Sequence, residues 1–437
     1  MDKDTWKSYR SGPMTLPILS QARRRERRQL LLVVLIAFLG ILLACSAHEQ
    51  LWYWSMLLGG SLGMGLLCLH FLFCLVGFTG DESLLPLCGY LCALSLIILC
   101  GGSPLLALRQ LQWILVGIVL VPFAALPRYW VQLAEYRYLS AIIGLALLLF
   151  TAFFGREQGG ARLWLAVGPV QFQPGEIVRL GLGVFLAAVF SENVRLFAHP
   201  TARLGPISIP EPRYLVPLLI MWVLFLFVLV VQKDLGAALL YYSLFAGLGF
   251  MATGQLSYLV LPAVLGGIGG VLAWAAFPHI RLRFQIWLDP WTTSSGSGYQ
   301  IIQAMFALAN GGWLGRGLGQ GYAHSLPAAY TDLPLAIVGE ELGFAGLLAV
   351  ITGHFLLVGR GLYLSCRCEH EFFRLLGLSI IIGWGLSVFL VNGGMLRLVP
   401  LTGLVTPFTS YGGSAMVSNF FCLGLLLNIS RQELWRA

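Results

Sequence analysis

Long apolar runs recur along the whole chain, and they constrain its fold more than any other feature. Each holds about 20 residues, which is the length an α-helix needs to cross roughly 30 Å of hydrocarbon. Twelve runs of this kind predict an all-α polytopic membrane protein, because helices satisfy their own backbone polar groups in lipid. The expected helices lie near residues 29–47, 53–78, 84–101, 106–126, 138–154, 175–192, 214–232, 234–252, 256–277, 335–358, 373–392 and 412–429.

The composition agrees with a membrane protein. Hydrophobic residues make up 58% of the chain and charged residues only 11%, whereas soluble chains carry about 25% charged residues. Part of the net charge of +8 lies in Arg23–Arg25 and Arg27–Arg28, directly before the first apolar run. We interpret this cluster as a cytoplasmic anchor under the positive-inside rule. Binding of nucleic acid is not expected, because no soluble domain follows. A signal peptide is not indicated either, since no small-residue cleavage site follows.

The distribution of basic residues predicts the topology. Threading the chain from a cytoplasmic N-terminus places both termini inside and leaves two sizeable outward loops, residues 155–174 and 278–334. The short polar link from Gln232 to Gly236 predicts a tight hairpin between antiparallel helices, and no internal repeat is evident. The inner loops and the tail then hold the remaining basic residues that the rule expects on the inside: Arg128, Arg137, Arg195, Arg203, Arg213, Arg360, Arg367, Arg374, Arg431 and Arg436.

The nine cysteines give no sign of a metal site or a disulfide. Six of them stand in apolar runs, where cysteine usually acts as a small hydrophobic residue: Cys68, Cys74, Cys88, Cys92, Cys100 and Cys422. Cys366 and Cys368 are separated by one residue in a basic loop that is predicted to face the reducing cytosol. We therefore expect neither a disulfide nor a metal site.

The first outward loop and the helix after it carry a cluster of polar residues. Arg162 and Trp164 stand in the loop, and we interpret Trp164 as a residue of the aromatic belt at the membrane interface. Gln173 precedes the helix. Glu176 and Arg179 are three residues apart near the helix start, so they share one face and can pair. This pair either fixes the register of a buried helix or contacts a substrate directly, and the sequence leaves both roles open.

The second outward loop is long enough to be functional. It spans 57 residues, is rich in glycine, and carries Asp332 near its far end. Residues 301–308 predict a short amphipathic helix on the membrane surface. Arg281, Arg283 and Arg316 beside one carboxylate would suit a substrate with a diphosphate leaving group and a hydroxyl nucleophile, and contact with lipid headgroups is the alternative.

Two further segments interrupt the apolar pattern. Lys233 and Asp234 stand side by side in the predicted hairpin, as a local anchor or as functional groups. Near the C-terminus, residues 395–403 and 407–414 contain two prolines and a glycine pair inside an apolar region. They predict a broken helix at membrane depth, which is tolerated only against protein or a water-filled cavity. Together these segments predict an outward-opening polar cavity in an apolar bundle.

Seven motifs occur in the order that is typical of one membrane family. They are Gly160–Trp164, Gln173–Arg179, Asp234–Gly236, Gly296–Gln300, Gly315–Gly317, Thr331–Gly343 and Pro407–Ser414. In this order the chain resembles the SEDS family (shape, elongation, division and sporulation), which includes RodA, FtsW and SpoVE. The resemblance covers residues 84–437, the ten-helix core of the family, with the loop 278–334 as its catalytic loop. Residues 1–28 form a basic cytoplasmic N-terminus, and residues 29–79 an additional N-terminal helix pair.

The resemblance implies a peptidoglycan glycosyltransferase that polymerises lipid II at the outer face of the bacterial cytoplasmic membrane, in complex with a class B penicillin-binding protein. Asp332 matches the family's essential aspartate. It would act as the general base on the 4-hydroxyl of the acceptor N-acetylglucosamine, which attacks the anomeric carbon of the donor N-acetylmuramic acid. Undecaprenyl diphosphate would leave, its charge offset by arginines or by a divalent cation, Mg²⁺ or Mn²⁺. No other cofactor is implied.

The resemblance also implies roles for residues around Asp332. Expected in substrate binding are Arg162, Trp164, Gln173, Glu176, Arg179, Lys233, Asp234, Arg281, Arg283, Arg316, Ser410, Tyr411 and Ser414. Expected in support of the site are Glu340, Glu341, Gly412 and Gly413.

The chain departs from the family pattern at three places, and none of them removes the acid. Arg179 stands where lysine is usual, Gly175 where serine is common, and Leu333–Pro334 where phenylalanine and isoleucine are usual. Two other functions remain alternatives: a lipid II transporter, and a non-catalytic scaffold that activates a penicillin-binding protein. The motifs do not separate a role in elongation from one in division or sporulation.

Overall fold

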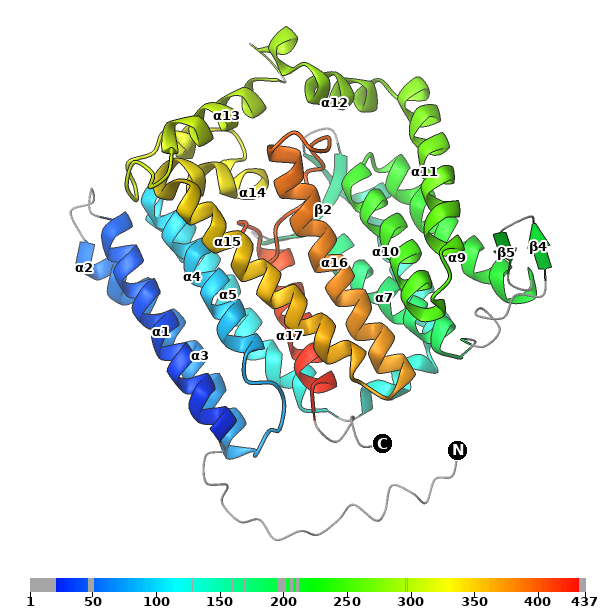
Figure 1. Ribbon diagram of the computed structural model, residues 1–437, viewed down its shortest axis with the longest axis horizontal. Helices are drawn as coiled ribbons and strands as arrows, with labels where there is room; N and C mark the ends of the chain where they lie inside the picture. The colour runs from blue at the N-terminus through cyan, green and yellow to red at the C-terminus, as the bar shows by residue number, and fades with distance from the viewer. Residues whose placement is uncertain are drawn as a thin grey trace.

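The computed structural model confirms a helical polytopic membrane protein (Figure 1). It describes residues 21–431 except 46–50, 128, 159–160, 169, 193, 195–201, 205–206, 210–211, 295 and 297. Within this part, nine helices are long and apolar enough to cross a membrane. The long helices are α1 (Gln21–Ala44), α3 (Gly60–Leu75), α4 (Leu84–Gly102), α5 (Pro104–Ala125), α6 (Arg137–Phe154), α7 (Gly175–Glu192), α9 (Pro212–Val231), α10 (Leu235–Thr253), α11 (Ser257–Ala276), α15 (Pro334–Cys366), α16 (Glu371–Met395) and α17 (Gly413–Ile429). α3 continues α2 (Leu51–Trp54) and a π-helical turn, η2 (Ser55–Gly59), as one rod. Only a short 3₁₀ segment, η3 (Tyr129–Ala134), lies between α5 and α6.

The long loop between α11 and α15 is itself largely helical. It contains α12 (Pro278–Leu288), η4 (Pro290–Thr293), α13 (Tyr299–Gly311), η5 (Ala323–Ser325) and α14 (Ala329–Asp332). The predicted helix at residues 301–308 is confirmed within α13. These elements cap one end of the bundle, at the top of Figure 1, and α1 begins and α17 ends at the opposite end. We call these the loop end and the terminus end.

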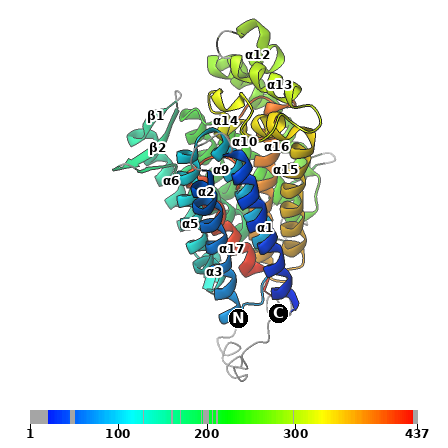
Figure 2. The same cartoon turned by 90° about the vertical axis from the view of Figure 1, so that its left-hand side faces the viewer.

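Two small antiparallel sheets replace loops that the sequence analysis left without structure. β1 (Arg156–Gln158), β2 (Ala161–Val167) and β3 (Val170–Phe172) pair in that order between α6 and α7. β4 (Ala202–Leu204) pairs with β5 (Ile207–Ile209) between α7 and α9. Apolar and polar residues alternate along part of β2, a pattern typical of a strand. Figure 2 shows β1 and β2 at one side of the bundle, toward its loop end.

Basic residues gather at the terminus end. Arg137 begins α6, Arg360 and Arg367 stand at the end of α15, Arg374 lies near the start of α16, and Arg431 follows α17. Arg128, Arg195 and Arg436 lie outside the described residues, as do the side chains of Arg203 and Arg213. Residues 1–20 of the predicted basic N-terminus are also outside this part, and α1 begins at Gln21, inside the predicted segment 1–28.

Close helix packing holds the centre of the bundle together. α5 and α17 pack tightly because Gly424 lacks a side chain: a Cβ there would lie 2.7 Å from the carbonyl oxygen of Val121 and 2.6 Å from the Cβ of Ala124. Small residues at such contacts let helix backbones approach in a membrane, where van der Waals packing drives association. α4 is buried along most of its length, between α1, α5 and α15.

The first two membrane rods, α1 and α2–α3, are joined by a buried polar cluster at the terminus end. The Nδ1 of His70 on α3 lies 2.7 Å from Oε2 of Glu26 on α1. Arg23 pairs with the same carboxylate and also donates to the carbonyls of Phe78, at 3.0 Å, and Gly80, at 2.9 Å. Charged groups are retained at such depth only when they are paired. The cluster therefore fixes this helix pair to the start of α4.

A disulfide between Cys45 and Cys100 joins α1 to α4 at the loop end, with their Cα atoms 6.2 Å apart. The expectation of no disulfide, which treated Cys100 as a small hydrophobic residue, is wrong. Cys45 directly follows α1, and Cys100 lies in the last turn of α4. The two helices are packed neighbours, so residues far apart in sequence meet at one level of the bundle. The spacing of cysteines in sequence carries no such information.

α15 is interrupted near its start. Gly343 has a positive φ of 65°, and the helix kinks there. The amides of Phe344 and Ala345 donate to the carbonyls of Gly312, at 2.9 Å, and Trp313, at 3.2 Å, in place of partners within α15. A Cβ at residue 343 would lie 2.4 Å from the backbone nitrogen of Gly315. Only glycine fits this position, and the glycine-rich loop enters the hydrogen-bond ladder of the helix.

Replacing Cys45 and Cys100 by alanine should lower the thermal stability of the protein in detergent. The loop that the disulfide closes spans 55 residues, for which chain entropy gives about 4 kcal/mol. This is an upper limit, because helices already inserted in a micelle retain less freedom than an unfolded chain. Cys88→Ala is the control, since it removes a free, buried cysteine from the same helix. Equal unfolding midpoints for the double variant and this control would contradict the prediction.

Candidate functional site

The side chain of Arg283, on α12, lies among three other segments at the loop end. Its Nη1 donates to the carbonyls of Leu401, at 3.0 Å, and Thr402, at 3.2 Å. Burial raises the pKa of both Asp332 and Asp234, and the charge of Arg283 acts in the opposite direction on both. This guanidinium therefore joins α12 to the segment after α16, and its charge reaches the end of α14 and the start of α10.

Asp332 is the last residue of α14, and its side chain is partly buried. Its backbone amide donates to the carbonyl of Ala328, at 2.9 Å, and Ala328 has a left-handed conformation that starts the turn. Burial raises the pKa of Asp332, and a hydrogen bond from Thr331 and the charge of Arg283 partly offset this increase. A carboxylate with a raised pKa that still meets water is a stronger proton acceptor than an ordinary aspartate.

Asp234 caps the start of α10. Its Oδ1 accepts a hydrogen bond from the amide of Ala237, at 3.0 Å, so the local anchor that the sequence suggested is present. The hairpin is as tight as predicted, since α9 ends at Val231 and α10 begins at Leu235. Lys233 has a left-handed conformation. Burial, and then the charges of Lys233 and Arg283, lower the pKa of His279 on α12.

Glu176 and Arg179 form a buried ion pair in the first turns of α7, with Oε2 and Nη2 3.1 Å apart. Arg179 also donates to Oδ1 of Asn419 on α17, at 2.9 Å, and Nε1 of Trp384 on α16 donates to the same oxygen, at 2.9 Å. The pair thus ties α7 to α16 and α17, as the register role requires. The charge of Glu176 also raises the pKa of Asp234, so the Glu176–Arg179 pair lies within electrostatic reach of Asp234.

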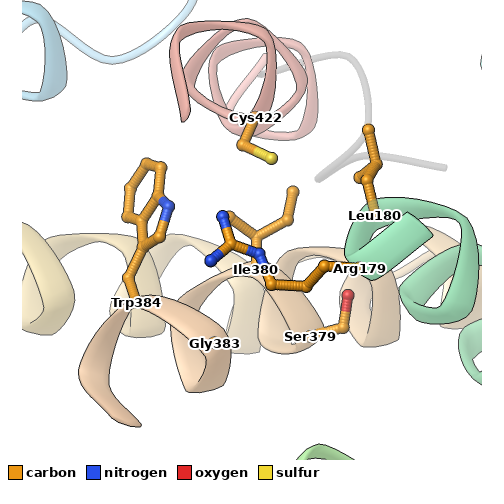
Figure 3. A pocket seen from close by; sticks show the side chains of 7 residues that line it. All are labelled: Arg179, Leu180, Ser379, Ile380, Gly383, Trp384 and Cys422. Atoms are coloured by element: carbon orange, nitrogen blue, oxygen red, sulfur yellow. The ribbon is translucent and has the colours of Figure 1, made fainter. Parts of the chain in front are cut away.

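A small cavity lies beside the Arg179 side chain (Figure 3). Its volume of about 10 Å³ is enough for a single water molecule. The cavity is lined by Arg179, Leu180, Ser379, Ile380, Gly383, Trp384 and Cys422. It is far too small for a sugar, so the Glu176–Arg179 pair supports the bundle in this conformation.

The segment between α16 and α17 is not helical and contains turns, in line with the predicted break, and buried polar side chains pair with its backbone. Gln110 on α5 donates to the carbonyl of Ser410, at 3.1 Å, and accepts from the amide of Gly412, at 3.3 Å. His354 on α15 lies 3.1 Å from the carbonyl of Pro407 and 3.1 Å from the hydroxyl of Thr409. Buried irregular backbone is tolerated when such partners are supplied.

The predicted residues of this segment have structural partners of their own. The hydroxyl of Ser410 accepts from the amide of Thr406, at 2.9 Å, and the hydroxyl of Ser414 accepts from the amide of Gln173, at 3.0 Å. The amide of Tyr411 donates to the carbonyl of Tyr330 on α14, at 2.8 Å. Gly413 begins α17, where a Cβ would lie 2.6 Å from the indole of Trp113. This segment therefore positions α14, and its contact with substrate stays a prediction.

Glu340 and Glu341 hold the glycine-rich loop from within α15. Both side chains are almost fully buried. Oε2 of Glu340 accepts from the amide of Ala323, at 2.7 Å, and Nε2 of His324 lies 2.6 Å from Oε1 of Glu341. The carbonyls of the two glutamates accept from the amides of Arg316 and Gly317, both at 2.9 Å. The supporting role expected for this pair agrees with these contacts.

Four of the predicted residues have contacts away from Asp332. Arg162 lies 3.5 Å from Glu157 on the exposed sheet, and Trp164 lies on the same sheet. Arg281 donates to the carbonyl of Ala275, at 3.1 Å, and stacks on Trp274. Arg316 lies 3.7 Å from Glu340. Their role in substrate binding stays a prediction, and Gly160 and Ser297 of the motifs lie outside the described residues.

Three residues that contribute to the site were missed at the sequence level: Gln110, His324 and His354. Gln110 and His354 are polar residues inside apolar runs, which is itself a signal of function or of a buried partner. His324 carries no such signal, because it stands in a polar loop. Within the described residues, no three His, Cys, Asp or Glu side chains stand together as ligands for a metal ion.

The fold and the site define a class of protein: a polytopic helical membrane protein with a carboxylate–arginine site where a long loop meets the bundle. The model of the FtsW, RodA and SpoVE family, described as cell cycle proteins, matches residues 92–434. The chain belongs to this family.

Named relatives agree. The chain is 37% identical over 361 residues to the peptidoglycan glycosyltransferase RodA of Mycobacterium leprae, covering 80% of this chain and 77% of that one. It is 39% identical over 329 residues to the RodA of Mycobacterium tuberculosis, covering 74% and 70%. To the probable peptidoglycan glycosyltransferase FtsW of Aromatoleum aromaticum it is 32% identical over 329 residues, covering 74% and 77%.

Solved structures show the same architecture. A chain of a peptidoglycan synthase complex that coordinates polymerization and crosslinking superposes with a TM-score of 0.67 at 29% identity, covering 81% of this chain and 98% of that chain. The rod shape determining protein RodA of Thermus thermophilus superposes with a TM-score of 0.58 at 25% identity, covering 82% and 98%.

The substitution Gln110→Leu should destabilise the folded protein by about 2–4 kcal/mol, because it leaves the carbonyl of Ser410 and the amide of Gly412 buried without partners. The measurement is the thermal unfolding midpoint in detergent. Leu111→Ala, one residue away, is a comparison that loses apolar volume but no hydrogen bond. If Gln110→Leu unfolds at the wild-type temperature, Gln110 does not hold the broken segment.

Proposed function

We propose that this protein is a peptidoglycan glycosyltransferase that polymerises lipid II and releases undecaprenyl diphosphate, with Asp332 as the general base. One observation carries the proposal: a partly buried carboxylate, whose pKa burial raises, stands at the loop end within electrostatic reach of an arginine that two carbonyls hold in place. The named relatives, RodA and FtsW, support the same activity.

The reaction requires one proton transfer and one displacement. The carboxylate of Asp332 takes the proton of the 4-hydroxyl of the acceptor N-acetylglucosamine as that oxygen attacks the anomeric carbon of the donor N-acetylmuramic acid. The new glycosidic bond forms as the bond from that carbon to the diphosphate oxygen breaks. The electron pair of that bond leaves with undecaprenyl diphosphate. The raised pKa of Asp332 increases its strength as a base.

Arg283 has two effects in this scheme. Its charge helps to keep Asp332 ionised at neutral pH, because it lowers the pKa that burial raises. The same guanidinium is held by two carbonyls, so it is an oriented cation against which negative charge on the departing diphosphate is stabilised. A divalent cation, Mg²⁺ or Mn²⁺, would add to this stabilisation if the substrate diphosphate carried it to the site.

We place the loop end outside the cell and the terminus end in the cytoplasm. The Cys45–Cys100 disulfide at the loop end suits the oxidising side of the membrane. Exposed arginines at the start of α1, among them Arg24 and Arg28, and Arg367 after α15 gather at the terminus end, as the positive-inside rule expects. This orientation exposes Asp332 on the side where the glycan is assembled.

A class B penicillin-binding protein is the partner we propose, supplying the transpeptidase. The solved structure with the TM-score of 0.67 is of a peptidoglycan synthase complex that couples polymerization to crosslinking. A shared fold at that level supports a complex of the same kind here.

Purified protein incubated with labelled lipid II should form glycan strands, and Asp332→Ala should lower that rate by roughly 10²–10⁴-fold, the usual contribution of a general base. Asp332→Asn, which keeps the shape of the side chain, should be equally inactive. Glu157→Gln, on the exposed sheet, is the control for loss of an acidic group. Transbilayer movement of lipid II without polymer would instead make the protein a transporter, and full activity of Asp332→Ala would overturn the assignment of the base.

The acid limb of the pH–rate profile should lie above the range of an ordinary aspartate, because burial raises the pKa of Asp332. Arg283 lowers that pKa, so Arg283→Gln should move the limb to still higher pH, and Arg283→Lys, which keeps the charge, should move it less. Arg281→Gln makes the same change of charge on the same helix and should leave the midpoint in place. A limb that stays fixed or moves to lower pH in Arg283→Gln would show that the limb does not report Asp332.

A further inference from the structure

We propose that His324 is a positioning residue that holds α14, and with it Asp332, through a hydrogen-bonded chain from Glu341 to Tyr330. The inference rests on the proposed role of Asp332 as the base. It gives a purpose to a histidine that the motifs do not include and that the mechanism does not use.

The distances make a continuous chain from a buried carboxylate to α14. Nε2 of His324 lies 2.6 Å from Oε1 of Glu341, and Nδ1 lies 3.1 Å from the phenol oxygen of Tyr330. An ionised carboxylate only accepts, so Nε2 carries the proton that is donated to Glu341. In the neutral ring Nδ1 then accepts from Tyr330. Burial raises the pKa of Tyr330 to about 12, so the phenol keeps the proton that it donates.

The outer end of α4 is shaped to admit this chain. A Cβ at Gly102 would lie 1.8 Å from the phenol oxygen of Tyr330 and 2.5 Å from Nδ1 of His324. A Cβ at Gly101 would lie 3.3 Å from Nε2 of His324. Two consecutive glycines, directly after Cys100 of the disulfide, therefore leave the space that the imidazole and the phenol occupy.

α14 depends on contacts from outside itself. It has four residues, which is too few for a helix to be stable alone. Its other tether is the hydrogen bond from the amide of Tyr411 to the carbonyl of Tyr330, at 2.8 Å. Tyr330 is thus held at its main chain by one segment and at its side chain by His324. Asp332 follows two residues later, so the direction of its carboxylate is set by how Tyr330 is held.

This role predicts a particular kinetic defect. A displacement of about 1 Å at a reacting group costs about 10²-fold in rate, whereas the affinity for substrate depends on groups that do not move. His324→Phe, which keeps a ring but loses both hydrogen bonds, should therefore lower kcat by roughly 10–100-fold with the KM for lipid II within about twofold of wild type. Tyr330→Phe, which removes a single oxygen, should lower kcat in the same way.

Two further variants distinguish positioning from loss of folding. His324→Gln carries an amide that reaches Glu341 and should restore part of kcat. The double variant His324→Phe with Tyr330→Phe should be no slower than the slower single variant, because both changes break one chain. If His324→Phe does not fold in detergent, Tyr330→Phe decides the question, since it changes no volume in the core.

The experiment is lipid II polymerisation by the full-length protein, with kcat and KM measured for each variant beside Asp332→Ala. Loss of kcat at unchanged KM in Tyr330→Phe, with partial recovery in His324→Gln, supports the proposal. Wild-type kcat in both Tyr330→Phe and His324→Phe, while Asp332→Ala is inactive, overturns the positioning role alone. A defect confined to KM overturns it as well. An active Asp332→Ala overturns the proposed base instead.

Discussion

The site depends on one guanidinium that bonds to two backbone carbonyls and whose charge acts on two carboxylates at the edge of an apolar bundle. Burial raises the pKa of both carboxylates, and a hydrogen bond together with the charge of Arg283 offsets part of this rise at each. Arg283 also bonds to the carbonyls of Leu401 and Thr402. The cation that acts on Asp332 is therefore fixed to the broken segment.

The polar interior of the bundle is organised around backbone that is not helical. The segment between α16 and α17 leaves amides and carbonyls that a helix would have paired, and Gln110 and His354 reach them from two other helices. In a low-dielectric interior each of these hydrogen bonds stabilises the fold more than it would in water, since an unpaired group would carry its full desolvation cost. The ion pair of Glu176 and Arg179 serves a similar purpose across α7, α16 and α17.

The sequence allowed the helices to be predicted well, because runs of apolar residues must become helices in a bilayer and their lengths are set by its thickness. The hairpin at residues 232–236, the helix within α13 and the break before α17 followed from local chemistry. The long-range pairs did not. Nothing in the sequence brings Cys45 to Cys100, Arg283 to Leu401, or His324 to Glu341, because each depends on which helix ends meet. The sheet of β1 to β3 was missed since its strands are short. The resemblance pointed to Asp332, but it could not show that Arg162 and Arg281 have their contacts elsewhere.

The interruption of α15 at Gly343 joins the glycine-rich loop to this helix through the main chain. Four backbone hydrogen bonds join the two. The amides of Phe344 and Ala345 donate to the carbonyls of Gly312 and Trp313, and the carbonyls of Glu340 and Glu341 accept from the amides of Arg316 and Gly317. Pulling this stretch away would break four backbone hydrogen bonds at once. It is a fixed wall. A change of shape at the loop end is therefore easier at α12, whose hydrogen bonds to the segment after α16 all pass through the side chain of Arg283, Trp287 or Arg397.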